Sequence, residues 1–165
     1  MKTMAVRYTR AIVFIVSCTV LIAGTSSLLA FAWPARVGAR ASIAQGSALW
    51  QGVYTEPQAR RGEKVFYDDC AYCHGIDLRG GDDPNGPPLK GPVFLRQWQG
   101  KTVEDLFHFM SETMPFDEPA SLKPEEYADV ISYILEANGI PAGNSELPAD
   151  AAKLKAFVFG DKPKG

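Results

Sequence analysis

The sequence predicts an all-α protein in which a few helices pack around one hydrophobic core. Apolar residues recur at helical spacing in several segments, and no segment shows the alternation of apolar and polar residues that marks a strand. Glycine and proline cluster between those segments and indicate loops. A chain of 165 residues, 46% of them hydrophobic, has room for one ordinary domain with extensions at its ends.

The helices are expected over about residues 56–71, 94–97, 102–111 and 123–138. Thr102 is placed to cap the third helix, with Asp105 three residues later. The last helix ends at Asn138-Gly139, a common C-terminal stop. Its apolar stripe consists of Tyr127, Val130, Ile131, Ile134 and Leu135.

The N-terminus has the pattern of an export signal. Three basic residues, Lys2, Arg7 and Arg10, precede an apolar run, and Ala30-Phe31-Ala32 offers a cleavage site before Trp33. We therefore expect residues 1–32 to be a signal peptide. The alternative is an uncleaved membrane anchor over residues 11–33, because no charge interrupts these 23 residues and about 20 apolar residues span a bilayer. Either alternative places the rest of the chain outside the cytoplasm.

The segment after this signal is expected to be acidic. The formal charge of the whole chain is −2, and loss of the three basic residues changes it to −5. This balance gives no reason to expect nucleic acid as a partner. We expect a linker arm over residues 33–52, a folded domain over residues 53–143 and a C-terminal extension over residues 144–165.

One short motif predicts a cofactor. Cys70-Ala71-Tyr72-Cys73-His74 places two thiols and an imidazole at the spacing that covalent attachment of one haem c requires. A structural zinc site normally has four protein ligands, and no second cysteine pair follows. A redox-active dithiol is expected in a βαβ context, which the sequence lacks. A plain disulfide is the remaining alternative.

Haem iron in an electron carrier needs a second axial ligand opposite His74. Met114 is the favoured candidate, because it lies in a loop before Pro115 and far enough along the chain to reach the opposite haem face. Met110 and His108 are the alternatives. Met110 lies on the apolar face of a predicted helix, where methionine usually fills the core. His108 lies off that face, where solvent exposure is expected.

These motifs resemble those of class I cytochromes c over about residues 53–143. Gly62 and Phe66 match the N-terminal helix of that family, which crosses the C-terminal helix at the counterparts of Val130 and Tyr133. The resemblance implies a small fold with these two helices crossing over one haem.

Three further haem contacts follow from the same resemblance. Pro87, in Gly86-Pro87-Pro88-Leu89, is implied as the carbonyl that accepts a hydrogen bond from the proximal histidine. Leu89 is implied to pack on the haem face. Trp98 is either a propionate-facing aromatic residue or a core tryptophan.

A second resemblance concerns the partners. Phrases such as Leu78-Arg79-Gly80-Gly81-Asp82 and Thr113-Met114-Pro115 resemble bacterial cytochromes that accompany quinoprotein (PQQ-dependent) dehydrogenases. This resemblance implies a periplasmic electron carrier that accepts electrons from such a dehydrogenase and passes them to a terminal oxidase or another cytochrome. The electrons are expected to leave on the cysteine side, near Arg79 and Lys90.

Two other functions remain open from the sequence. A haem with an open sixth position could reduce peroxide or bind gases, but catalysis would need a histidine or arginine over the iron, and nothing marks His108 for that role. The chain could also be an anchored subunit of a larger complex, with membrane contact only if residues 11–33 are retained.

Overall fold

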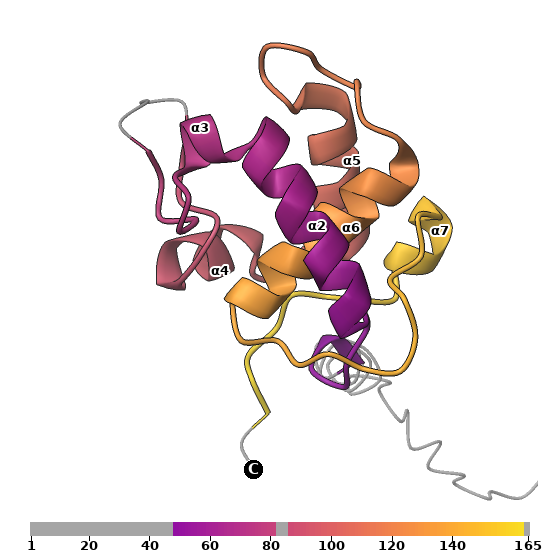
Figure 1. Ribbon diagram of the computed structural model, residues 1–165. Coiled ribbons are helices and arrows are strands. Elements are labelled where there is room, and N and C mark those ends of the chain that lie inside the picture. The colour runs from indigo at the N-terminus through magenta and orange to yellow at the C-terminus, as the bar shows by residue number, and fades with distance from the viewer. Residues whose placement is uncertain (1–47, 82–85, 164–165) are drawn as a thin grey trace, which may run out of the picture. The chain divides into compact units, whose positions relative to one another are not determined.

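The computed structural model describes residues 48–81 and 86–163 of the chain (Figure 1). The expected signal peptide or anchor and most of the expected linker arm lie outside the described residues. The helices are α2 (Glu56–Asp69), α3 (Ala71–His74), α4 (Pro92–Trp98), α5 (Val103–Thr113), α6 (Pro124–Ala137) and α7 (Ala151–Leu154). The described residues contain no strand, and an isolated antiparallel bridge joins Thr102 to Val158. The all-α prediction is confirmed.

Helices α2 and α6 cross at a close backbone contact (Figure 1). Gly62 lies directly against the Asp129 carbonyl of α6, and a Cβ at this position would overlap that carbonyl. One turn later, the Phe66 ring packs on Tyr133, with centroids 5.4 Å apart. The predicted crossing is confirmed, and its cause is the missing side chain of Gly62, which lets the two backbones meet.

Local hydrogen bonds fix where the helices begin and end. The Thr102 amide donates to the Asp105 carboxylate at 2.7 Å, and the Asp105 amide donates to the Thr102 hydroxyl at 3.1 Å. This reciprocal pair satisfies two amides that the first turn of α5 would otherwise leave unpaired. Helix α6 ends as predicted, because Gly139 adopts a positive φ of 74° that favours glycine.

The first helix differs from the expected range of about 56–71. Helix α2 ends at Asp69, and Cys70 leaves the helical conformation with φ −127° and ψ −32°. The chain then turns into α3, a single turn that carries Cys73 and His74. This break redirects the motif away from the axis of α2.

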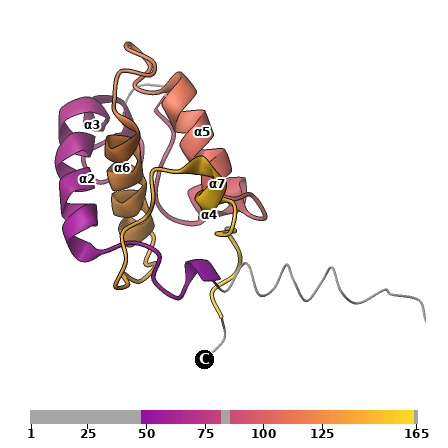
Figure 2. The same ribbon diagram turned by 90° about the vertical axis from the view of Figure 1, so that its right-hand side faces the viewer.

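Residues 144–163, expected as an extension, contribute to the core. Leu147, Leu154 and Phe159 are buried, and α7 lies against α5 (Figure 2). The Phe159 amide donates to the Lys101 carbonyl at 2.9 Å. Leu49, within the expected linker arm, is also buried in this core. Within residues 48–81 and 86–163, none of the helices has the length and apolar composition that a membrane span requires.

Candidate functional site

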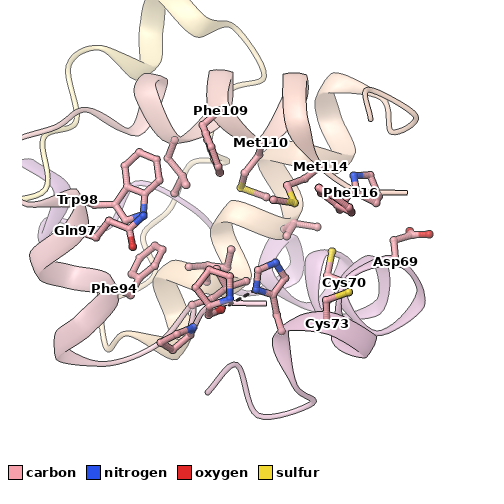
Figure 3. A pocket seen from close by; sticks show the side chains of 18 of the residues that line it. Asp69, Cys70, Cys73, Phe94, Gln97, Trp98, Phe109, Met110, Met114 and Phe116 are labelled. Carbon is pink, nitrogen blue, oxygen red and sulfur yellow. Dashed lines mark hydrogen bonds between the residues drawn. The ribbon is translucent and has the colours of Figure 1, made fainter. Parts of the chain in front are cut away.

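A pocket of about 220 Å³ lies between α3, α4, α5 and α6 (Figure 3). Its walls are mainly apolar, and each of these helices contributes side chains to them. The apolar lining residues include Leu89, Phe94, Leu106, Phe109, Val130 and Ile134. All seven residues that the sequence analysis proposed as cofactor contacts line this pocket: Cys70, Cys73, His74, Pro87, Leu89, Trp98 and Met114.

The two cysteines lie together on one side of the pocket. Figure 3 shows their side chains next to each other at one edge of the pocket. The Cys73 amide donates to the Cys70 carbonyl at 3.2 Å, and the His74 amide donates to the same carbonyl at 3.0 Å. The short helix α3 and its N-cap residue Cys70 therefore place two thiols and one imidazole around a single cavity.

The environment of Cys70 disfavours the ionised form of its thiol. Burial raises the pKa of the Cys70 thiol to about 12, and the neighbouring Asp69 and Cys73 add to the shift. A redox-active dithiol has a lowered thiol pKa, because the thiolate is the reactive form. In the described part of the chain, no group of three or more His, Cys, Asp or Glu side chains is arranged to hold a metal ion.

His74 is held in one orientation by a backbone carbonyl. Its side chain is buried, and Nδ1 lies 2.8 Å from the Pro87 carbonyl oxygen, a contact drawn as a dashed line in Figure 3. Because a carbonyl only accepts, Nδ1 must carry the proton, and Nε2 keeps its lone pair for a metal ion. Gly86 permits this contact, since a Cβ there would overlap the Cys73 carbonyl.

Met114 is the C-cap of α5 and lies close to Met110 in Figure 3. Figure 3 shows both methionine sulfurs directed into the pocket. The Met114 carbonyl accepts a hydrogen bond from the Tyr127 hydroxyl at 2.7 Å, which ties the backbone of this residue to α6. His108 is not among the lining residues. Its side chain is 66% exposed and lies 3.4 Å from Glu112, so the expected solvent exposure of His108 is confirmed.

Trp98 lines the pocket as part of an aromatic cluster. Its ring contacts Phe94, Phe109 and Phe159 at centroid distances between 6.0 and 6.3 Å. Trp98 is buried in the core and also lines the pocket, and its position beside a haem propionate stays a prediction. The ammonium of Lys101 lies 4.8 Å from the centroid of the same ring.

Asn138 holds the loop that carries Leu89, a contact that no sequence motif indicates. Asn138 donates to the Leu89 carbonyl at 2.9 Å, and its side-chain oxygen accepts from the Gly91 amide at 2.9 Å. This pair anchors the loop that carries Leu89 to the end of α6. Asn138 was identified only as a helix stop, and no local pattern indicated its contact with a loop 47 residues away.

The residues present fit a haem. A flat, largely hydrophobic macrocycle matches the apolar walls, and an imidazole nitrogen and thioether sulfurs are directed into the cavity. The paired thiols on one side are placed for covalent attachment.

Comparison with known proteins agrees with this geometry. The family model for cytochrome c oxidase, cbb3-type, subunit III matches residues 57–134. A cytochrome c of Cannabis sativa is 30% identical over 101 residues, which cover 48% of this chain and 89% of that protein. The chain belongs to the cytochrome c family. The cytochrome therefore carries a haem c attached covalently through Cys70 and Cys73.

Two other relatives are similar to the cytochrome over part of their length. A cytochrome c-553-like protein of Synechocystis sp. is 36% identical over 76 residues, 46% of this chain and 66% of that protein. A thiosulfate dehydrogenase of Psychrobacter arcticus is 29% identical over 114 residues, 66% of this chain. The cytochrome spans about a third of that dehydrogenase, 32% of its length. No solved structure matches the chain significantly.

Proposed function

We propose that the cytochrome is a monohaem electron carrier of the periplasm, with His74 Nε2 and Met114 as the axial ligands. The supporting observation is that His74 and Met114, from different helices, both line the same pocket. His74 is fixed by the Pro87 carbonyl, and the Met114 thioether is directed into the same apolar cavity. When bound, the haem supplies the one-electron couple of its iron, and a thioether ligand favours the reduced state.

The protein's own residues would keep this site rigid and dry. The Pro87 contact holds the imidazole, the Tyr127 hydroxyl holds the Met114 backbone, and Asn138 holds the Leu89 loop. Because the Pro87 carbonyl holds the His74 imidazole and the Tyr127 hydroxyl holds the Met114 backbone, we expect both ligands to stay in place in either oxidation state. A small change in ligand geometry between the two oxidation states favours rapid electron transfer over substrate chemistry.

The pocket lining supports electron transfer over peroxide or gas chemistry. The described residues around the cavity include no lysine or arginine and no histidine besides His74. General acid catalysis on a bound peroxide would need such a group over the iron. His108, the remaining histidine, faces solvent.

We propose a periplasmic dehydrogenase as the electron donor and a terminal oxidase or another cytochrome as the acceptor. The resemblance to cytochromes of quinoprotein (PQQ-dependent) dehydrogenases supports the donor, and the matching oxidase-subunit family supports the acceptor. The thiosulfate dehydrogenase relative adds sulfur-compound oxidation as a second class of donor. The location follows from the export pattern of residues 1–32.

The visible spectrum of the purified holoprotein tests the ligand pair. The expected result is a low-spin c-haem spectrum with the weak long-wavelength band of thioether ligation in the oxidised state. A high-spin spectrum would contradict the proposal and favour an open sixth position.

The donor is tested by steady-state reduction of the oxidised holoprotein. A quinoprotein alcohol dehydrogenase with its alcohol is compared with a thiosulfate dehydrogenase with thiosulfate. Faster reduction by the quinoprotein supports the proposed donor, and faster reduction by thiosulfate dehydrogenase assigns the second class.

Mass spectrometry of the mature protein tests the location. A mature N-terminus near Trp33 supports a free periplasmic carrier. Retention of residues 11–33 would instead make the cytochrome an anchored subunit of a membrane complex.

A further inference from the structure

A second hollow opens beside the haem pocket, at the edge formed by the cysteine motif and the loop after Met114. Six residues define this surface, called the acidic hollow below: Asp68, Asp69, Tyr72, Phe116, Asp117 and Glu118. The first three come from α2 and α3, and the others from the loop between α5 and α6.

The charge of the acidic hollow is uncompensated. Among the residues that the structure describes, none of its four carboxylates forms an ion pair with a lysine, arginine or histidine. Burial raises the pKa of Asp69, and Asp68, Glu126, Asp117 and Glu118 raise it further through their negative charges. Four acidic groups that repel one another at one edge of a protein produce a negative field that attracts cations.

Two aromatic side chains project from the same surface. Tyr72 is 92% exposed and Phe116 is 70% exposed. Large apolar groups in water are unfavourable, and aromatic residues are enriched at the centres of protein interfaces. Aromatic side chains among carboxylates therefore match a partner that has an apolar centre and a basic rim.

The acidic hollow is continuous with the haem pocket. Cys73, Asp69, Pro115, Phe116 and Asp117 line both cavities. A partner seated in the hollow would therefore lie immediately outside the wall to which the haem is attached.

The two basic residues that the sequence predicts near the site of electron exit are not part of the acidic hollow. Arg79 and Lys90 were expected to surround the site of electron exit, but neither lines the hollow. The Arg79 guanidinium instead lies 3.2 Å from the Asp77 carboxylate.

We propose that the acidic hollow is the docking surface for a redox protein whose own face carries lysine and arginine side chains around an apolar centre. The proposal rests on the proposed function, since it names where the electron-transfer partner binds. Charge complementarity selects this partner. A second copy of the chain would place carboxylates against carboxylates, and an anionic membrane surface would be repelled in the same way.

The test measures electron exchange between the reduced holoprotein and a lysine-rich cytochrome c as the basic probe. Stopped-flow rates are compared at about 0.01 M and 0.1 M ionic strength, where the screening length falls from about 30 Å to about 10 Å. The test variant is Asp68→Asn/Asp117→Asn/Glu118→Gln. The control, Glu56→Gln/Glu104→Gln/Asp161→Asn, removes the same charge from other parts of the surface.

The acidic-hollow variant is expected to react about tenfold more slowly at low salt and to lose most of its salt dependence. The control should stay within about twofold of the wild type. Equal slowing in both variants would show a net-charge effect and overturn the proposal. Unchanged rates in both variants would also overturn it, as would self-association of the wild-type holoprotein through this surface.

The aromatic contribution has its own variant. Tyr72→Ser should weaken binding of the probe about fivefold and leave the salt dependence intact, because it removes contact area and no charge. Unchanged binding would overturn the assignment of Tyr72 to the interface.

Binding of a redox-inactive, zinc-substituted form of the same probe separates the two proposals. If the zinc-substituted probe binds at the acidic hollow but the iron-containing probe exchanges no electrons with the holoprotein, the proposed function is contradicted and the docking surface is kept. Exchange that is indifferent to all three variants would contradict the docking surface and keep the proposed function.

Discussion

Met110 and Met114 bring the same chemical group into the pocket from one side of α5. They are four residues apart, so they lie on one face of the chain at successive turns. The two residues differ in backbone conformation. Met110 is inside the helix and buried, whereas Met114 is the C-cap of α5 in an extended conformation. The extended backbone and the Tyr127 contact orient Met114, and Met110 packs as part of the core.

We predict that Met114→Ala abolishes the long-wavelength thioether band of the oxidised holoprotein. The reduction potential should fall by about 0.1 V or more, since axial ligands tune haem potentials over roughly 0.8 V. Spectroscopy with redox titration measures both effects. Met110→Leu is the matched control and should keep the band. Loss of the band in Met110→Leu with retention in Met114→Ala would assign the ligand to Met110.

At the scale of elements, the crossing of α2 and α6 positions the haem motif. Helix α2 leads directly into Cys70, and α6 supplies Val130 and Ile134 to the pocket wall. The contact at Gly62 sets the distance between these two elements. Any displacement of α2 at this contact would be transmitted along the helix to the cysteines.

We predict that Gly62→Ala destabilises the fold by about 1–3 kcal/mol or more, because the added methyl group overlaps the α6 backbone. Urea unfolding of the holoprotein measures this loss. Lys64→Ala, at an exposed position of the same helix, is the control and should stay within about 0.5 kcal/mol. An equally small effect for both variants would contradict the close crossing.

At the scale of the whole molecule, residues 144–163 stabilise the core through contacts with α2, in addition to the crossing of α2 and α6. The Gln58 side chain pairs with the Leu147 backbone, with Nε2 to carbonyl at 2.9 Å and Oε1 to amide at 2.6 Å. Arg61 binds Asp129 of α6 and Glu146 of this segment. We propose that the folding unit extends from Leu49 to Phe159, beyond the expected domain of residues 53–143.

Phe159→Ala tests this proposal. Its ring is buried against Phe94 and Trp98, so truncation should cost about 3–5 kcal/mol. Thermal unfolding should show a lower midpoint, and tryptophan fluorescence should report loosening around Trp98. Lys155→Ala, in the same segment but exposed, should change little. A wild-type midpoint in Phe159→Ala would mean that the domain ends near residue 143.

Some predictions succeeded because their causes are local. The periodicity of α6, the cap at Thr102 and the stop at Gly139 all depend on residues within one or two turns of each other. The Gly62 crossing is a long-range contact, and it could be predicted only through resemblance to a family with a fixed fold. The axial role of Met114 stays a prediction.

The sequence by itself determined the cofactor and the class of fold, because covalent haem attachment needs five consecutive residues and helix formation needs only neighbours. The tertiary structure alone decided that Phe159 belongs to the core, that Asn138 anchors the Leu89 loop and that two methionines share the pocket. It also gathered the carboxylates of α2 and of the loop after Met114 into one acidic hollow. These residues are distant in the chain, and only the packing of the helices brings them together.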